Sequence, residues 1–589
     1  MFDNPLVLYD GNCSFCRIWI QYWNQLTGDR LDYATSQEAA ERVPQIPAEN
    51  FGQSVQLVMP EGEVISGARA VFTTLTFAPG MAWLLWLYEH VPGFAAVSEA
   101  AYRMIAGHRT FFYYLTRVTF GRRILSLRYA GAEWIFLRIL AFIYFIAFAS
   151  LGVQVTGLIG ERGIMPVGRY LTAISQNFGP QGYRMMPSIF WFAHGDRMLE
   201  TVCVAGAAIA IVLALGYFER LSLACLYVLY LSLCTAGQEF MSFQWDFLLL
   251  ETGFLAIFLG NSKLVVWLFR WLVFRLTFLS GAVKLMSHDS TWRNLTALNY
   301  HYWTQPLPTP IAWYVNQLPF WVHRFSTAMV FVIELAVPFL FSGPRLWRFF
   351  GGSCLLFLQT LILMTGNYTF FNLLTMALCL FLFDDAALAK LRLKTRRVRI
   401  KPGLAVAVAG IILVLSVSEL GGMFFGSSEE ANDLVRLAAP FGIVNTYGLF
   451  AVMTTTRPEI IVQGSDDRKT WLDYEFKYKP GDLQKPPRWV APHQPRLDWH
   501  MSCAALSGAR GAPWFDNFMV RLLQGSPDVS ALLAKDPFQG APPKYVRALL
   551  FNYSFTDFSA RRATGNWWKR TPRGMYFPEI SLQDVRIKE

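Results

Sequence analysis

The stretch that decides the fold runs from Gln238 to Pro308 and begins QEFMSFQWDFLLLETGFLAIFLGNSKLVVWLFRWLVFRLTFLSGAVKLM. Its apolar runs are hydrophobic enough to enter a bilayer, yet they contain several ionisable side chains: Asp246, Glu251, Arg270, Arg275 and Lys284. An unpaired charge at mid-depth in a bilayer costs at least ~2.5–3.5 kcal/mol. We therefore expect these side chains to face a protein interior or a water-filled cavity, either as ion pairs that fix helix packing or as parts of a pocket.

The composition places the whole chain in the same class. Of its 589 residues, 54% are apolar and only 16% are charged, whereas about a quarter of the residues of a soluble domain are charged. The formal charge is +11, but the basic residues gather beside apolar runs, as they do at the cytoplasmic flanks of spans. No basic module of a nucleic-acid-binding type is present. The sequence predicts a polytopic membrane protein whose partner is the lipid bilayer and not a nucleic acid.

Nine apolar runs are long enough to cross a bilayer: 134–157, 199–217, 221–237, 245–260, 264–283, 320–342, 347–365, 369–388 and 403–425. An odd number of crossings puts the two chain ends on opposite sides. The cationic run from Lys390 to Lys401 and the arginines between Arg109 and Arg128 should lie inside, by the positive-inside rule. We therefore expect a cytoplasmic N-terminal domain and an exported segment after Phe425, in a bacterial inner membrane or, in a eukaryote, in the endoplasmic reticulum membrane.

The chain starts with a soluble piece that contains a pair of cysteines. Leu6–Tyr9 predicts a short buried strand and the pattern from Ile18 onward predicts a helix, with Cys13 and Cys16 at the turn between them. The helix dipole and the free N–H groups at a helix N-terminus stabilise a thiolate and lower its pKa. Cys13 is therefore the predicted attacking thiol and Cys16 the resolving thiol. The alternative is half of a zinc site, but no second Cys/His pair lies nearby, so we expect no metal.

The octapeptide Tyr9-Asp10-Gly11-Asn12-Cys13-Ser14-Phe15-Cys16 resembles the signature of the DCC family of thiol-disulfide oxidoreductases. The resemblance extends through Gly67-Ala68-Arg69-Ala70 and covers roughly residues 1–125. It implies a thioredoxin-like fold, thiol exchange with an unidentified thiol partner, and Asp10, Cys13 and Cys16 as the motif positions. Asp10 either accepts the proton of the resolving thiol or caps the helix. A candidate for the cis-proline that faces the dithiol in thioredoxins is not visible before Val55.

Three membrane motifs resemble the lipase maturation factor family: residues 244–253 (QWDFLLLETG), 280–284 (SGAVK) and 366–374 (GNYTFFNLL). Three more follow the last span, at 474–482, 491–499 and 565–570. The resemblance spans about residues 130–589 and implies a membrane core over 130–425 and an exported domain over 426–589. It also implies a function in the folding and assembly of secreted lipases, with an exported lipase-like client as the partner.

The same core is faintly similar to vitamin K-dependent gamma-carboxylase, in which a glycine-containing helix leads to a lysine and then to a tryptophan, as Gly281, Lys284 and Trp292 do here. This likeness implies a membrane enzyme that acts on a lipid or protein with Lys284 as a base, since burial lowers a lysine's pKa. The alternative is an ion-paired or snorkelling Lys284 at a helix end. Its acidic partners would come from Asp246, Glu251 or Glu334. Arg270 lies fourteen residues before Lys284 and therefore on the same helix face.

The loop 285–318 is rich in aromatic and proline residues: Trp292, Tyr300, His301, Tyr302, Trp303, Pro306, Pro308 and Pro310. Trp and Tyr are enriched at membrane interfaces, so we expect an interfacial belt, with a ligand-lining role as the alternative. His301 alone does not make a metal site.

The segment after Phe425 reads as a β-rich domain. Residues 459–479 predict two strands around an Asp-containing turn, residues 514–533 a helix and residues 546–555 a strand. Aromatic, arginine and histidine side chains within its motifs are candidates either for client binding or for a small β core: Trp471, Tyr474, His493, Arg496, Trp499, Trp567 and Trp568. Cys503 is the only cysteine in this segment, so we expect it to act on clients by binding and not by disulfide shuttling.

The predicted fold class is a polytopic α-helical membrane protein of about nine spans, with an N-terminal α/β thioredoxin-like domain and a C-terminal β-rich exported domain. No haem or quinone motif is present in the sequence, so we expect no cofactor.

Overall fold

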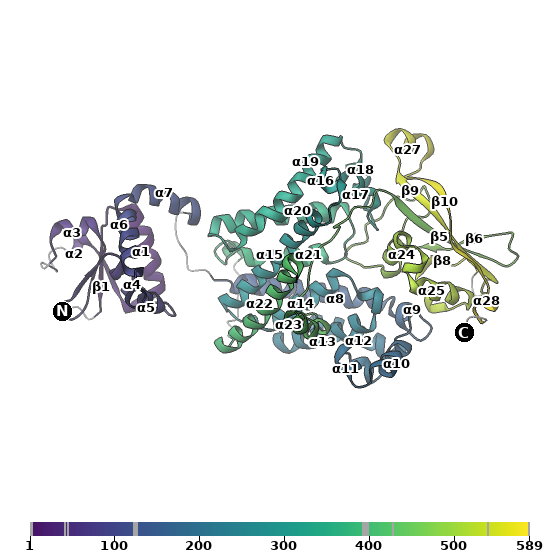
Figure 1. Cartoon of the computed structure of the whole chain (residues 1–589), viewed down its shortest axis with the longest axis horizontal. Coiled ribbons are helices and arrows are strands. Elements are labelled where there is room, and N and C mark those ends of the chain that lie inside the picture. The colour runs from purple at the N-terminus through teal and green to yellow at the C-terminus, as the bar shows by residue number, and fades with distance from the viewer. Residues whose placement is uncertain are drawn as a thin grey trace. The chain divides into compact units, whose positions relative to one another are not determined.

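The computed structural model describes residues 4–39, 43, 46–121, 128–391, 400–426, 429–538 and 541–586 (Figure 1). It divides into two compact units. The first comprises Met1–Arg128 and Ser342–Phe350, and the second comprises Tyr129–Phe341 and Gly351–Glu589. Arg122, Arg123 and most of the cationic run 390–401, on which the predicted sidedness depends, lie outside the described residues.

The first unit is built on a four-stranded sheet of order β2-β1-β3-β4. The strands are β1 (Leu6–Tyr9), β2 (Asp32–Thr35), β3 (Gln56–Val58) and β4 (Val64–Ser66). β1 pairs with β2 in parallel and with β3 antiparallel. Alternate residues of β1 enter two small apolar clusters, Leu6 and Leu8 in one and Val7 in the other, because successive side chains of a strand point to opposite faces. The first unit is therefore a small α/β domain.

The helices of this unit are α1 (Ser14–Thr27), α2 (Ser36–Ala39), α3 (Ala48–Gln53), α4 (Gly67–Thr76), α5 (Trp83–His90), α6 (Phe94–Gly107) and α7 (Arg109–Phe120), with the 3-10 turn η1 (Gly28–Arg30). α7 packs on α1, and α4 packs on α5 and α6.

Among the described residues, seven helical segments are long and apolar enough to cross a membrane. They are α8 (Ala130–Gly152), α12 (Asp196–Leu215), α13 (Glu219–Ala236), α15 (Lys263–Met286), the segment Phe320–Ser342, α20 (Arg345–Thr365) and α22 (Pro402–Phe425). The segment Phe320–Ser342 consists of α19 (Phe320–Phe331), a π turn η4 (Val332–Ala336) and a 3-10 turn η5 (Val337–Ser342). Pro338 has no N–H to donate to the carbonyl of Glu334, which is a physical reason for this departure from α geometry.

Two of the nine predicted spans are shorter helices. α14 (Gln244–Ile257) has 14 residues, and α21 (Phe371–Leu378) continues only into the turn η6 (Cys379–Leu382). At 1.5 Å per residue, α14 is about 21 Å long, less than the ~30 Å of a hydrocarbon core. The predicted spans 245–260 and 369–388 are longer than the helices that the structure contains. The apolar runs continue past Ile257 and past Leu382, where the helices end.

Two long connections between the apolar helices contain short helices of their own. Residues 158–198 contain α10 (Val167–Phe178), α11 (Gln181–Met185) and η2 (Ile189–Trp191), and follow α9 (Val155–Ile159). Residues 285–318 contain α16 (Ser290–Arg293), α17 (Leu298–Thr304) and α18 (Pro310–Asn316). Trp292, Tyr302 and Trp313 are buried in protein, and the latter two share a cluster with Tyr553 and Trp568. The expectation of an interfacial belt is therefore wrong for Trp292 and Tyr302.

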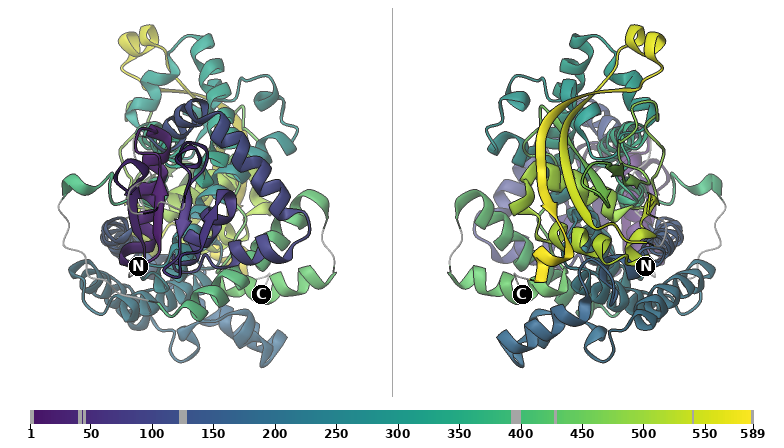
Figure 2. Two further views of the ribbon diagram at one scale, coloured as in Figure 1. Left: turned by 90° about the vertical axis from the view of Figure 1, so that its left-hand side faces the viewer. Right: turned by 90° about the vertical axis from the view of Figure 1, so that its right-hand side faces the viewer.

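The C-terminal part is built on a four-stranded antiparallel sheet of order β10-β9-β5-β6. Its strands are β5 (Arg457–Ser465), β6 (Leu472–Asp473), β9 (Tyr545–Phe555) and β10 (Trp568–Ile580). Figure 2 shows β9 and β10 as two long curved neighbours. A second, two-stranded sheet pairs β7 (Glu475–Phe476) with β8 (Leu533–Lys535).

The remaining elements are η3 (Gln238–Met241), η7 (Ala389–Leu391), α23 (Glu429–Ala438), η8 (Ala439–Phe441), α24 (Arg496–Ser507), η9 (Ala509–Gly511), α25 (Pro513–Leu523), α26 (Pro527–Ser530), α27 (Phe558–Thr564) and α28 (Leu582–Arg586). α24 packs on β5 and on η3, and α25 packs on β9. Two strands around a turn at 459–479 and the strand at 546–555 are present as predicted. The helix predicted over 514–533 is shorter, because α25 ends at Leu523 and β8 begins at Leu533. α24 and β10 were not predicted.

Candidate functional sites

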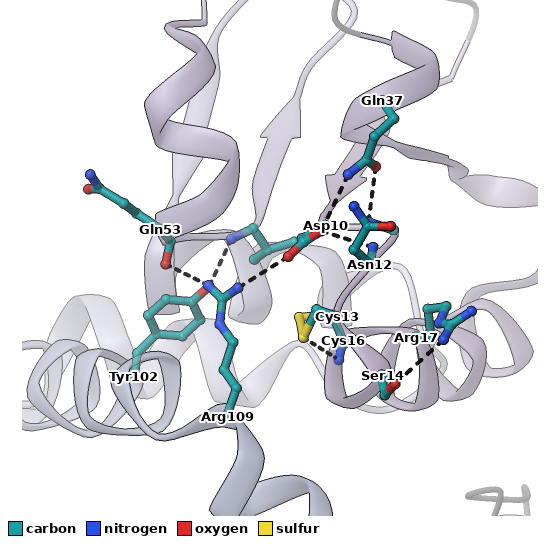
Figure 3. Close-up of a disulfide and its surroundings, with 12 residues drawn as sticks. Asp10, Asn12, Cys13, Ser14, Cys16, Arg17, Gln37, Gln53, Tyr102 and Arg109 are labelled. Carbon is teal, nitrogen blue, oxygen red and sulfur yellow. Dashed lines mark hydrogen bonds and ion pairs between the residues drawn. A yellow bond between two sulfur atoms is a disulfide. The ribbon is translucent and has the colours of Figure 1, made fainter.

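The cysteine pair lies at the turn from β1 to α1, as the sequence predicts. Cys13 is the N-cap of α1 and forms a disulfide with Cys16 (Figure 3). The backbone N–H of Cys16 donates to Cys13 Sγ at 3.1 Å. After reduction, this N–H group and the helix dipole would stabilise a negative charge on Cys13. Both cysteines are half-buried, so a partner sulfur can approach them.

Asp10 does not cap the helix. Its Oδ1 accepts from the N–H of Asn12 at 2.9 Å, and its Oδ2 lies 3.7 Å from Arg109 Nη1. Arg109 also donates to the Gln53 carbonyl at 3.0 Å, so α7 is tied to the turn that carries the dithiol (Figure 3). Asp10 therefore shapes this turn and neutralises Arg109, a contact that sequence reasoning missed because the two residues are far apart in the chain.

A cavity of about 240 Å³ lies beside Cys16. Its wall is mostly apolar, with Phe15, Trp19 and Trp23 from α1 and Ile105 from α6, and Arg109 lies at its edge. Tyr102 also lines the cavity, and burial raises the pKa of its phenol. A partner sulfur flanked by an apolar side chain fits this environment. In the described part of the first unit no X–Pro bond is cis, so a cis-proline does not form one side of the groove there.

The four candidates in the membrane core are all held by polar contacts, and they do not converge on one site. Asp246 accepts two hydrogen bonds from the guanidinium of Arg496, at 2.8 and 3.0 Å, and a third from Tyr230 Oη at 2.5 Å. Arg496 Nη1 also donates to the Phe240 carbonyl at 2.5 Å. Both charged side chains are at most 2% exposed. Arg496 therefore joins the C-terminal part to α14.

Glu251 lies in a second buried pair, with Arg275 of α15. Its Oε2 accepts from the Tyr447 hydroxyl at 2.7 Å and from the backbone N–H of Asn445 at 3.1 Å. Arg275 Nη1 donates to the Asn445 carbonyl at 3.1 Å. The chain after α23 thus returns to α14 and α15, and binds both charges of this ion pair.

Lys284 pairs with Glu334, at 2.8 Å between Nζ and Oε2, and also donates to the Ser280 carbonyl at 3.0 Å. This is the ion-paired alternative for Lys284. The pair borders a cavity of about 110 Å³. Arg270 is elsewhere: it donates to the Phe381 carbonyl at 2.8 Å and to the Tyr129 hydroxyl.

Three further contacts connect the C-terminal part to the membrane core. Asn367, after α20, donates to the Arg488 carbonyl at 2.8 Å and accepts from the N–H of Val490 at 2.8 Å. Ser150 of α8 hydrogen-bonds His493 Nδ1 at 2.8 Å. Arg457, which pairs with Glu459, donates to the Trp303 carbonyl at 2.9 Å. We call these contacts, with the Asp246–Arg496 and Glu251–Asn445 contacts, the core–tail seam.

The core–tail seam bears on which of the seven client-binding candidates a client could reach. Tyr474, Arg496, Trp499 and Trp568 are buried, while Trp471, His493 and Trp567 are half-exposed. The rings of Trp471 and Trp567 lie under Arg547 and Arg561, at 3.9 and 3.5 Å from ring centroid to guanidinium carbon. Burial, reinforced by Lys477 and Arg496, lowers the pKa of His493, so this side chain is neutral at physiological pH.

A groove of about 540 Å³ lies in the C-terminal part. Tyr474 and Trp568 line it, together with several basic side chains: Lys477, Lys485, Arg488, Lys535 and Arg570. Lys485 pairs with Glu475. Nowhere in the described residues do three His, Cys, Asp or Glu side chains meet as a metal site would require.

The fold and the sites define a class: a multi-helix membrane protein that carries a dithiol α/β domain before its spans and a β-rich segment after them. Family models agree with this division. The lipase maturation factor transmembrane domain matches residues 132–390, the lipase maturation factor C-terminal domain matches residues 443–578, and DCC1-like thiol-disulfide oxidoreductase matches residues 7–114.

Similar proteins identify the family. Lipase maturation factor 2 of Xenopus laevis is 35% identical over 75% of this chain and 81% of its own length. Lipase maturation factor 1 of Bos taurus is 36% identical over 78% of this chain and 91% of its own length, and that of Homo sapiens is 35% identical over 78% and 90%. The chain belongs to the lipase maturation factor family, which confirms the resemblance found in its motifs. No solved structure matches it.

Proposed function

We propose that this chain is a membrane-embedded maturation factor for exported enzymes of the lipase class, and that its N-terminal domain adds thiol-disulfide exchange. Similarity over three quarters of the chain to proteins named lipase maturation factors carries the first part. The Cys13–Cys16 pair at the N-terminus of α1 carries the second. The carboxylase-like alternative gains no support, because the ammonium of Lys284 donates to Glu334 and to a carbonyl.

The position of the two cysteines supports an exchange in two steps. The thiolate of reduced Cys13 attacks one sulfur of a partner disulfide and releases the other as a thiol, which leaves a mixed disulfide. Cys16 then attacks Cys13 Sγ, closes the Cys13–Cys16 bond and releases the second partner thiol. Two electrons pass from the dithiol to the partner, and the reverse sequence passes them back. The apolar cavity beside Cys16 would hold the side chain next to the partner sulfur.

The client surface that we propose is the groove in the C-terminal part. Its exposed basic side chains, Arg488, Lys535 and Arg570, have room beside them for an acidic client segment. The buried candidates Tyr474 and Trp568 support its walls. Because Cys503 is the only cysteine described beyond the last span, contact there would occur by binding alone.

We also propose the three-part organisation 1–125, 130–425 and 426–589, with the dithiol domain in the cytoplasm and the C-terminal part exported. If α14 and α21 each return to the side from which they enter, seven complete crossings remain. Seven is odd, as nine is, so the two chain ends would still lie on opposite sides of the membrane. The membrane is then the bacterial inner membrane, or the endoplasmic reticulum membrane in a eukaryote.

The test is co-expression of the chain with a secreted lipase in cells that lack their own maturation factor, with lipase activity measured per amount of lipase protein. The wild-type chain should raise this specific activity. Arg488→Glu with Lys535→Glu should remove most of the gain by making the groove repel acidic segments, and Cys13→Ser should reduce it. Cys503→Ser serves as the matched control and should leave the gain unchanged.

The outcomes separate the parts of the proposal. No gain from the wild-type chain contradicts the maturation function. A gain that survives Cys13→Ser contradicts the coupling to thiol exchange, and one that survives the double glutamate variant contradicts the groove.

A further inference from the structure

Helix α7 has an apolar face that the other elements of its own unit leave uncovered. Its exposed side chains are Phe111, Tyr114, Leu115 and Val118, which are 63%, 61%, 45% and 62% exposed. They lie at positions i, i+3, i+4 and i+7, so they form a single stripe along the helix. A helix on the surface of a water-soluble domain normally presents polar residues there. We call these four side chains the α7 stripe.

The other side of α7 packs on α1. Phe112 packs near Phe15 and Phe120 near Trp19, with ring centroids 6.5 and 6.3 Å apart, and Thr116 is 5% exposed. The α7 stripe is therefore not part of the domain core. Exposing contiguous large apolar side chains to water is unfavourable, and such patches mark contact surfaces.

The connection to the next helix limits what can cover the stripe. α7 ends at Phe120 and the first membrane-spanning candidate, α8, begins at Ala130. The nine intervening residues reach at most ~35 Å even when fully extended. The end of α7 is therefore tethered close to the membrane, on whichever side the domain lies.

Charge complements the apolar surface. Arg117 flanks the stripe within α7 and Arg128 precedes α8, and the sequence adds Arg122 and Arg123 between them. Helices with an apolar face beside basic residues bind in the interface of bilayers that contain anionic lipids. No acidic residue occurs between Arg109 and Arg128, so nothing in this stretch opposes that attraction.

We propose that α7 lies in the plane of the membrane interface, with the α7 stripe inserted among the lipids and Arg117 at anionic headgroups. Because α1 packs on the opposite side of α7, the dithiol is then held about one helix diameter, ~10–12 Å, from the bilayer surface. Its thiol partner would be met at the membrane surface and not in bulk solution. This inference does not depend on the proposed maturation function.

The test measures depth by spin labelling. The full-length chain, with the free cysteines Cys203, Cys225, Cys234, Cys354, Cys379 and Cys503 changed to alanine, is reconstituted in nanodiscs of phosphatidylcholine and phosphatidylglycerol. Single variants Phe111→Cys, Tyr114→Cys and Val118→Cys carry a nitroxide, with Leu115→Cys as a substitute if one does not fold. Glu63→Cys, exposed in the turn between β3 and β4, is the matched control.

Collision rates with lipid-soluble O2 and with a water-soluble nickel chelate are compared. Sites of the α7 stripe should favour O2 severalfold over the control site, and the preference should weaken in phosphatidylcholine alone. Stripe sites as open to nickel as position 63 would overturn the proposal by placing the stripe in water. Sites shielded from both reagents would overturn it in favour of a protein surface. A thermal unfolding midpoint equal to that of the unlabelled protein verifies that each variant is folded.

Discussion

Single buried charges connect distant parts of this chain. Asp246 and Arg496 are 250 residues apart, and they share two hydrogen bonds in a site with almost no exposure. The cost of removing such charges from water is recovered only while both are present, so removing one leaves an uncompensated charge. The motif that contains Asp246 and the motif that contains Arg496 therefore supply the two partners of one buried ion pair. Because Arg496 is buried in this pair, it cannot contact a client.

Changing Arg496→Met should lower the free energy of unfolding by about 3–5 kcal/mol. The double variant Asp246→Leu with Arg496→Met should recover a large part of this loss, because no charge then stays buried alone. Thermal unfolding of the detergent-solubilised protein measures both. The exposed pair Arg468–Glu579 is the matched control, and Arg468→Met should cost no more than about 1 kcal/mol. Equal losses in the single and double variants would mean that the pair is not coupled.

At the scale of elements, helix packing depends on close approach at a few glycines. A Cβ on Gly253 of α14 would lie 1.8 Å from the hydroxyl oxygen of Tyr144 in α8, and one on Gly206 of α12 would lie 2.3 Å from a ring carbon of Phe148. α14 is short for a span but is buried along most of its length. It therefore stabilises the core by packing and by its two carboxylates, whether or not it crosses the bilayer.

Gly253→Ala should destabilise the protein by about 1–3 kcal/mol, the usual range for overpacking. Gly410→Ala in α22 is the matched control, because nothing lies within 4 Å of its added Cβ, and alanine there should be neutral or stabilising by up to about 1 kcal/mol. The unfolding midpoint should therefore fall for Gly253→Ala and stay the same or rise for Gly410→Ala. A Gly253→Ala protein as stable as the wild type would show that α8 and α14 separate easily.

For the whole molecule, the decisive quantity is the number of crossings between the dithiol and the C-terminal part. An odd number separates thiol exchange from client contact, and an even number brings them to one side. The core–tail seam fixes the C-terminal part to one end of the membrane helices through contacts to α8, α14 and the residue after α20.

A membrane-impermeant maleimide checks this separation. In closed cells, Cys503, the exposed cysteine of α24, should react from outside. Cys13 and Cys16 should react only in inverted vesicles and only after reduction. Labelling of both places from the same side would overturn the sidedness and leave the family assignment unaffected.

The sequence by itself determined the class of the protein and the place of its dithiol. These conclusions depend on local patterns, which can be recognised in the sequence alone: apolar runs, the spacing of Cys13 and Cys16, and the motifs from Gln244 to Arg570. It predicted the strand β9 and most spans, but it overestimated α14, because an apolar run does not reveal where its helix ends. Only the tertiary structure decided which carboxylate meets which cation, which aromatic residues are buried, and that Arg496 binds the membrane core. Those choices depend on contacts between residues hundreds of positions apart, which no local pattern encodes.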